Sequence, residues 1–150
     1  MEVCKVEAQG IPTWGPSRKM KKYIAIGSNS SCSEQDAFLR ISQYDMNCPT
    51  GLVERGITQS PAKFSSLDWI DFRDDNGIIA GGMEDGAITL WDPAKFLGST
   101  SEHLKMGKGC VSATKVHGDF PVSAIEFNPH RSNLLASGGQ EVLIQDISGN

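Results

Sequence analysis

The feature that most constrains this chain is an internal repeat of about 55 residues. Three short apolar segments with glycine at or near their ends, YIAIGS, IIAGGM and LLASGG, begin at Tyr23, Ile78 and Leu134. Sequences that repeat at such a period fold into units that bury their apolar faces only against one another. The chain is therefore expected to form a series of similar units rather than one irregular core.

Each unit has the pattern of several short β-strands. A large aromatic residue precedes each segment, and we expect these three side chains to be equivalent anchors of the unit cores: Trp14, Trp69 and Phe127. After each segment come two apolar residues that share one face of a strand: Leu39 and Ile41, Ile88 and Leu90, Val142 and Ile144. Period-two alternation is typical of antiparallel strands with one buried face.

The stretch GIIAGGMEDGAITLWDP, residues 77–93, has the pattern of a β-hairpin. Residues 83–86 supply the turn, because Gly86 is free to adopt a positive φ. The neighbouring carboxylates of Glu84 and Asp85 are then solvated turn residues rather than a general acid/base pair.

One more extended segment precedes each unit: VCKVEAQ from Val3, LVERGITQ from Leu52 and CVSATKVH from Cys110. Four strands per unit, repeated radially, are typical of the blades of a β-propeller. We therefore predict an all-β fold that contains about three blades of a propeller.

The predicted boundaries are residues 10–46 for the first blade, 51–95 for the second and 110–148 for the third. Residues 1–9 are predicted to form a latch strand, which in a closed ring would pair with the last blade. Three blades cannot close a ring, and an open stack exposes apolar faces at both ends. We expect the chain to be part of a longer propeller, and in isolation to associate with itself or with another chain.

Several motifs resemble those of a known family. AITLWDP, residues 87–93, matches the Trp-Asp ending of WD repeats, and LLASGGQEVLIQDI, residues 134–147, resembles it with Gln145 in place of tryptophan. FSSLDW, the hairpin continued to AKFLG, and HGDFPVSAIEFNPHRSNLLASGG are similar to the beginning of the SEC31 family, the large subunit of the outer cage of the COPII vesicle coat.

The resemblance implies a seven-bladed WD-repeat propeller that acts as a scaffold in transport from the endoplasmic reticulum to the Golgi. The implied partners are the small WD subunit of the outer coat, the inner coat and other copies at the cage vertices. The implied location is cytoplasmic, peripheral on COPII vesicles and at endoplasmic reticulum exit sites. Segments that stimulate the coat GTPase come later in the family's proteins and are not assigned to this chain. The alternative is a WD-repeat adaptor that recognises a peptide, such as a ubiquitin-ligase substrate receptor.

The resemblance also implies structural WD-motif residues. WD blades often link a histidine, a serine or threonine, the tryptophan and an aspartate by hydrogen bonds. The corresponding residues here are Trp91, Asp92, His117, Ser137 and Asp146. Because Gln145 replaces the tryptophan in the last unit, we expect the network to be incomplete.

Composition and spacing argue against several other functions. The net charge is −4, and the basic run at residues 18–22 is too short for a nucleic-acid footprint. No apolar run approaches the roughly 18 residues that span a bilayer. The four cysteines, Cys4, Cys32, Cys48 and Cys110, include no close pair, so we expect free thiols and no bound metal.

Catalytic motifs are missing from the sequence as well. The three histidines are not spaced for a shared metal, no Gly-x-Ser-x-Gly occurs, and the glycine pairs lack the lysine and helix of a phosphate cradle. We therefore expect no enzymatic activity and no cofactor. Two loops, residues 29–35 and 95–109, are the places where a partner contact could be encoded, although their Ser and Gly content is equally that of flexible loops.

Overall fold

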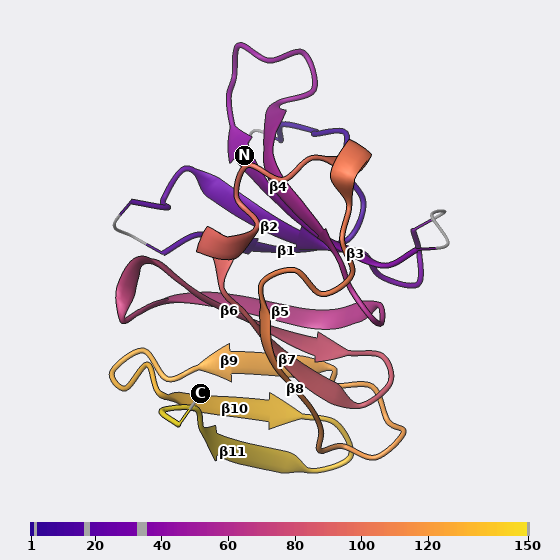
Figure 1. The fold of residues 1–150 in the computed structure, drawn as a ribbon, viewed down its shortest axis with the longest axis vertical. Helices are drawn as coiled ribbons and strands as arrows, with labels where there is room; N and C mark the ends of the chain where they lie inside the picture. The colour runs from indigo at the N-terminus through magenta and orange to yellow at the C-terminus, as the bar shows by residue number, and fades with distance from the viewer. Residues whose placement is uncertain (2, 17–18, 33–35, 150) are drawn as a thin grey trace.

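The computed structural model describes residues 1, 3–16, 19–32 and 36–149. Outside them lie Glu2 of the predicted latch, Arg18 of the basic run and residues 33–35 of the first candidate loop. The described chain forms three antiparallel β-sheets stacked along the long axis of the molecule (Figure 1). The prediction of an all-β fold is confirmed.

The strands follow the chain order through the sheets. The first sheet has the order β1-β2-β3-β4, with β1 Ile11–Trp14, β2 Tyr23–Gly27, β3 Phe38–Tyr44 and β4 Leu52–Gln59. The second has the order β5-β6-β7-β8, with β5 Phe64–Phe72, β6 Asp74–Met83, β7 Ala87–Trp91 and β8 Cys110–Lys115. The third consists of β9 Ala124–Phe127, β10 Leu134–Gly138 and β11 Val142–Asp146, with β10 in the centre.

The predicted blade boundaries were wrong at the fourth strands. β4 pairs with β3, with Thr58 opposite Leu39, and therefore completes the first sheet instead of opening the second. In the same way β8 pairs with β7 and completes the second sheet. Each sequence repeat is thus offset from the sheets by one strand.

The predicted latch strand is also absent from the structure. Residues 1 and 3–9 belong to no strand, and the Glu7 amide of this segment donates a long hydrogen bond of 3.4 Å to the Thr50 carbonyl, in the turn between β3 and β4. An outer strand needs a neighbouring edge to pair with, and the first sheet already has its own outer strand, β4.

The apolar cores lie between the sheets. Between the first and second sheets, Ala25 and Ile41 on one side share a cluster with Trp69 on the other. Between the second and third sheets, Ala80 and Leu90 share a second cluster with Phe127. Each sheet thus buries one face against the next, as the blades of a propeller do.

Phe64 packs between the first two sheets and joins them. Its ring is fully buried and lies 6.3 Å from the Trp91 ring, centroid to centroid, at an interplanar angle of 45°. The ring lies so close to Gly27 of β2 that a Cβ on that glycine would lie 2.6 Å from the Phe64 Cγ. The Phe64 amide also donates to the Ser28 carbonyl at 2.8 Å, so both packing and a backbone hydrogen bond join the sheets here.

The predicted hairpin of residues 77–93 is present as β6 and β7. Gly86 adopts a φ of +89°, and the Asp85 carboxylate accepts a hydrogen bond of 3.1 Å from the Ala87 amide. Asp85 therefore stabilises the turn itself, whereas the Glu84 carboxylate accepts a hydrogen bond of 3.0 Å from the Ser30 amide in the first candidate loop.

The candidate loop at residues 95–109 is held by backbone hydrogen bonds along the outer edge of β4. The Gly98 amide donates to the Arg55 carbonyl at 2.7 Å, while the Gln59 carbonyl accepts from Gly107, also at 2.7 Å. The loop contains the 3₁₀ turn Ser101–His103, and another such turn, Pro93–Lys95, leads into it. It covers an edge that would otherwise be open to further strand pairing.

The two ends of the stack differ from the prediction. Trp14 is 58% exposed, so its assignment to a blade core was wrong. Val142 and Ile144 are 76% and 73% exposed, although their equivalents Ile88 and Leu90 are buried. The reason is the same at both ends: the face is built like those in the middle, but among the described residues no further sheet covers it.

Candidate functional site

The WD-motif residues of the last unit are partly assembled. The side chains of His117 and Ser137 are both buried, and their Nε2 and Oγ atoms lie 2.8 Å apart. This bond ties the connection that precedes β9 to the middle strand β10. The other imidazole nitrogen, Nδ1, is buried without a hydrogen-bond partner among the described residues, as is Oε1 of Gln145.

Trp91 is held by its own strand. Its indole Nε1 donates to the Thr89 hydroxyl at 2.8 Å, and that hydroxyl lies 3.3 Å from the Gly81 carbonyl on β6. A serine or threonine on the middle strand takes no part, because Gly81 occupies the position that Ser137 has in the last sheet. The sequence did not indicate Thr89, whose role follows from its place two residues before the tryptophan.

The two aspartates have local roles. Asp92 accepts a hydrogen bond of 3.1 Å from the Ala94 amide and so caps the 3₁₀ turn Pro93–Lys95. Asp146 accepts from the Ser148 amide at 2.9 Å and from the Asn133 side chain at 3.1 Å. Hydrogen bonds that Ser148 donates, followed by the one from Asn133, lower the pKa of Asp146 from 3.8 to about 2.

The structure therefore brings together only His117 and Ser137 of the five WD-motif residues. A serine and a histidine at this distance have the geometry of a nucleophile and its base. Both are buried, however, and no carboxylate orients Nδ1. The pair is a structural hydrogen bond between a loop and a strand.

Polar contacts between the sheets were missed by the sequence reasoning. Asp68 on β5 accepts a hydrogen bond of 2.7 Å from the Phe127 amide at the end of β9. Ser66 donates to the Val122 carbonyl at 2.6 Å, which joins β5 to the connection before β9. Burial raises the pKa of the Asp68 carboxyl, and the hydrogen bonds from Phe127 and Trp69 oppose this rise. These side chains fix the position of the third sheet on the second.

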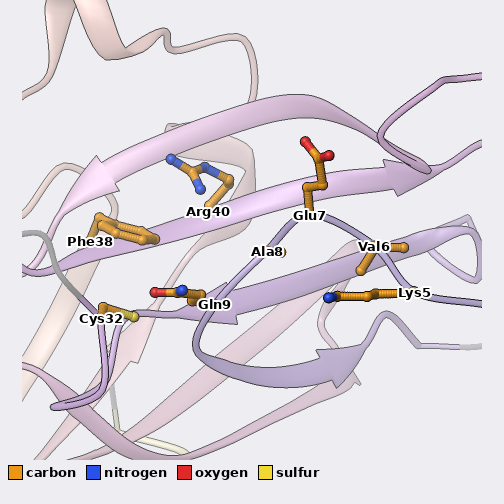
Figure 2. Close-up of a pocket in the computed structure, with 8 residues that line it drawn as sticks. All are labelled: Lys5, Val6, Glu7, Ala8, Gln9, Cys32, Phe38 and Arg40. Carbon is orange, nitrogen blue, oxygen red and sulfur yellow. The ribbon is translucent and has the colours of Figure 1, made fainter.

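A cavity of about 480 Å³ lies between residues 5–9 and the first sheet (Figure 2). Its floor includes Phe38 and Arg40 on β3, and the Arg40 guanidinium lies over the Phe38 ring at 4.6 Å. Lys5 and Glu7 line the opposite side. This groove has a mixed lining, with the charged Lys5, Glu7 and Arg40 beside apolar side chains such as Val6 and Phe38.

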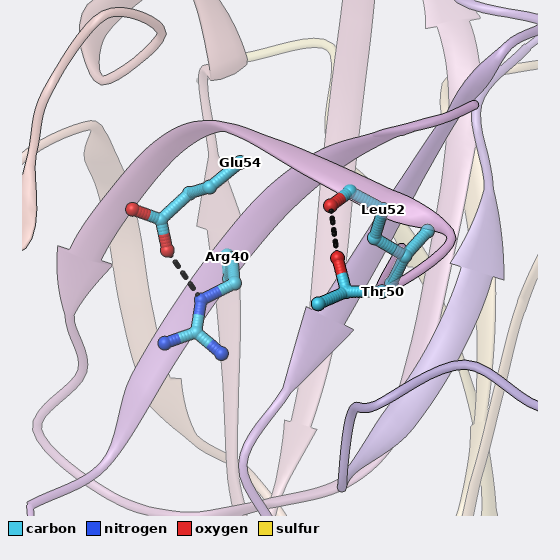
Figure 3. A network of polar contacts seen from close by, with 4 residues as sticks. All are labelled: Arg40, Thr50, Leu52 and Glu54. Atoms are coloured by element: carbon cyan, nitrogen blue, oxygen red, sulfur yellow. Dashed lines mark hydrogen bonds and ion pairs between the residues drawn. The ribbon is translucent and has the colours of Figure 1, made fainter. Parts of the chain in front are cut away.

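The Arg40 guanidinium is already paired. Its Nε donates to Glu54 Oε1 on β4 at 2.6 Å (Figure 3). Further along the same edge, the Thr50 hydroxyl donates to the Leu52 carbonyl at 2.9 Å and closes the turn before β4. A ligand in the groove would therefore meet a neutralised ion pair instead of a free cation.

The described residues form neither a metal site nor a membrane-spanning helix. Within them, no three His, Cys, Asp or Glu side chains are grouped so that they could hold a metal ion. None of the described helices is long and apolar enough to cross a membrane. All four cysteines are free thiols.

Comparisons with known proteins relate the chain to one family. It is 32% identical over 158 aligned residues to protein transport protein SEC31 of Dictyostelium discoideum, covering 96% of this chain and 11% of that protein. It is 40% identical over 148 residues to SEC31 of Ajellomyces capsulatus, covering 90% of this chain and 11% of that protein. No protein-family model matches the chain.

Solved structures share the fold. A structure described as the outer coat vertex of COPII on membranes matches with a TM-score of 0.62 and 20% identity, over 93% of this chain and 35% of that one. The WD40 domain of Toxoplasma gondii coronin matches with a TM-score of 0.63 and 18% identity, over 97% of this chain and 35% of that one. At such identities the match shows the fold alone.

The stack of two four-stranded sheets and one three-stranded sheet, together with the Trp-Asp hairpin, defines the chain as a WD-repeat β-propeller segment. Because this segment is 32% to 40% identical to SEC31 proteins over at least 90% of its length, the chain belongs to the SEC31 family. It spans 11% of the length of these two relatives.

Proposed function

We propose that the chain is a scaffold segment of a COPII outer-coat subunit and works by protein–protein contact, without catalysis. The observation that carries the proposal is its identity to SEC31 proteins over almost all of its length. The fold match to the outer coat vertex structure agrees with it. The buried His117–Ser137 pair, which offers no access to a substrate, supports a structural role.

The partners and location follow from this proposal. The chain would act with the small WD subunit of the outer coat, with the inner coat and with further copies at cage vertices. It would be cytoplasmic and peripheral on vesicles that leave the endoplasmic reticulum. The ordered loop at residues 95–109 and the groove beside residues 5–9 are the surfaces available for such contacts.

A reconstitution experiment tests the proposal. Tagged chain is mixed with purified outer- and inner-coat proteins on liposomes, and its recovery with the membranes is measured. The WD40 domain of Toxoplasma gondii coronin is the matched control, because it has the same fold at 18% identity. Coat-dependent recovery of the chain, but not of the control, is expected. Equal recovery of both, or recovery of neither, would overturn the proposal.

The second candidate is a WD-repeat adaptor that recognises a peptide, such as the substrate receptor of a ubiquitin ligase. The observation that favours it is the groove between residues 5–9 and β3, which has room for an extended segment. Affinity purification of the tagged chain from cells separates the two candidates. Enrichment of ligase subunits without coat subunits would favour the adaptor and contradict the coat scaffold.

A further inference from the structure

A pocket lies where the outer strand of the first sheet meets the long loop of the second. The loop of residues 95–109 runs along β4, where its Gly98 amide donates to the Arg55 carbonyl at 2.7 Å (Figure 1). Beside this contact lies a pocket of about 440 Å³, whose lining includes Tyr23 of β2, Arg55 of β4 and residues 97–100 of the loop. Its walls belong to two sheets that pack against each other inside the chain, so the pocket does not lie at either end of the stack.

The Arg55 guanidinium is held on the pocket side of β4. Its Nε donates to the Gln43 Oε1 at 3.0 Å. Gln43 lies opposite Tyr23 in the ladder of β2 and β3, and the side chains of opposite residues share one face of a sheet. The guanidinium therefore lies on the same face as Tyr23, which lines the pocket. Because this bond uses only Nε, the donors on the two terminal nitrogens are left for a ligand.

A second cation reaches the pocket from the loop. The Lys108 Nζ donates to the Ser99 hydroxyl at 3.0 Å, and Ser99 is one of the lining residues. An ammonium group has three donors, so Lys108 keeps two of them after this bond. No carboxylate among the described residues forms an ion pair with Arg55 or Lys108.

The pocket is rich in donors and poor in negative charge. The carboxylate in its lining, that of Glu54, is already paired with the Arg40 Nε at 2.6 Å. The other polar side chains of the lining are hydroxyls, those of Tyr23, Ser99 and Thr100, and each can donate a hydrogen bond. Two cations and three hydroxyls around one space suit a ligand that carries negative charge on several acceptor oxygens.

We propose that this pocket, the Arg55 pocket, binds a phosphate monoester, carried as a phosphorylated serine or threonine on a partner protein. The guanidinium supplies a planar fork of donors that matches phosphate oxygens, and Lys108 adds a point charge. The volume lies within the roughly 300–1,000 Å³ of pockets that take small ligands, which leaves room for the side chain that carries the phosphate. Arginine-based capture of phosphorylated segments is a recurrent mode of protein recognition.

A phosphorylated peptide fits the site better than a membrane surface does. Binding to anionic lipids relies on several basic residues clustered near the surface, each of which adds a modest attraction. This chain has a net charge of −4, and the exposed Glu102 lies in the same loop as Lys108. A single phosphate group needs only the two cations of the pocket. The proposal does not depend on the coat function.

NMR of the labelled chain tests the proposal. The probe is the capped peptide Gly-Gly-phosphoserine-Gly-Gly, and two control peptides carry unmodified serine or glutamate in place of phosphoserine. The phosphopeptide is expected to shift the backbone amide signals of Gly98, Ser99 and Thr100 in a saturable way. The serine peptide is expected to leave them in place, and the glutamate peptide, with fewer acceptor oxygens and less charge, to bind more weakly.

Variants locate the binding. Arg55→Gln and Lys108→Gln are each expected to lower the affinity for the phosphopeptide by about tenfold or more, because hydrogen bonds between charged groups are the strong ones. Lys105→Gln is the matched control, since it removes the same charge from the same loop but Lys105 does not line the pocket. All three side chains are exposed, and circular dichroism confirms that each variant is folded.

A lipid arm separates the two sources of phosphate. Phosphatidylcholine vesicles that contain phosphatidylinositol 4-phosphate are sedimented with the wild type and with Arg55→Gln. Cosedimentation of the wild type alone, without binding of the phosphopeptide, would assign the pocket to a lipid headgroup and overturn the proposal. Unshifted signals at residues 98–100, equal binding of either control peptide, or an equal loss of affinity in Lys105→Gln would overturn it as well.

Discussion

Replacing Gly27 with alanine is expected to destabilise the fold by forcing the first two sheets apart. The added Cβ would lie 2.6 Å from Phe64 Cγ and 2.7 Å from Cδ2, whereas carbon atoms pack at about 3.5–4.0 Å. The ring would have to move by roughly 1 Å in a site where it is fully buried. Overpacking of this kind costs about 1–3 kcal/mol.

Phe64→Leu separates overpacking from other effects. Alone it removes the ring and costs about 2 kcal/mol, less than the roughly 3–5 kcal/mol of truncation to alanine. In the double variant, Gly27→Ala with Phe64→Leu, the smaller leucine side chain makes room for the methyl group of the new alanine. The double variant is therefore expected to lose less stability than the two single variants together, with a coupling free energy of about 1–2 kcal/mol.

Urea unfolding of the wild type, the two single variants and the double variant measures this coupling. Gly138→Ala is the matched control: Gly138 pairs with Val142 on the third sheet as Gly27 pairs with Leu39 on the first. A Cβ there would meet only the Ala124 Cβ, at 3.7 Å, so this variant is expected to change stability by less than about 1 kcal/mol. If Gly27→Ala were neutral, or its cost simply added to that of Phe64→Leu, the packing of Phe64 between the sheets would be refuted.

Two further substitutions and one titration test the turns and the hydrogen bonds. Ser137→Ala leaves a buried imidazole without its partner and is expected to cost about 1–3 kcal/mol in urea unfolding; an unchanged midpoint would show that the bond is not formed. Gly86→Ala is expected to destabilise more than Gly118→Ala, because both have positive φ but only at Gly86 would the Cβ meet a carbonyl, at 2.1 Å; equal melting temperatures would contradict this. Hydrogen bonds donated by Ser148 hold the pKa of Asp146 below its usual value, so the contribution of this carboxylate to stability is present above pH 3.8 and lost as pH falls through about 2; an NMR titration with a midpoint near 3.8 would argue against it.

The repeated strands and the hairpin could be predicted because local pattern determines them. Period-two alternation marked β3 and β7, and Gly86 marked the turn between β6 and β7. Which sheet each fourth strand joins could not be read from the chain. A repeat records the order of strands along the sequence, whereas pairing depends on which edge is free in space.

The local sequence pattern could not predict which side chains are buried at the ends of the stack either. Trp14 and Trp69 occupy equivalent register positions, yet one is 58% exposed and the other 5%. The difference lies in whether another sheet packs against the face. The role of Asp68 could not be predicted for a similar reason, because the amide that donates to its carboxylate, that of Phe127, lies 59 residues away in the sequence. The order of the loop at residues 95–109 arises from backbone hydrogen bonds, which its Ser and Gly content does not reveal.

The pairing of the fourth strands, β4 and β8, makes the three sheets consecutive blades. NMR of the labelled chain can locate them through cross-strand contacts between backbone protons. Contacts between Thr58 and Leu39, and between Ala113 and Thr89, are expected, together with contacts from the Gly27 α-protons to the Phe64 ring. Contacts from residues 52–59 to β5, with none to β3, would contradict the blade arrangement.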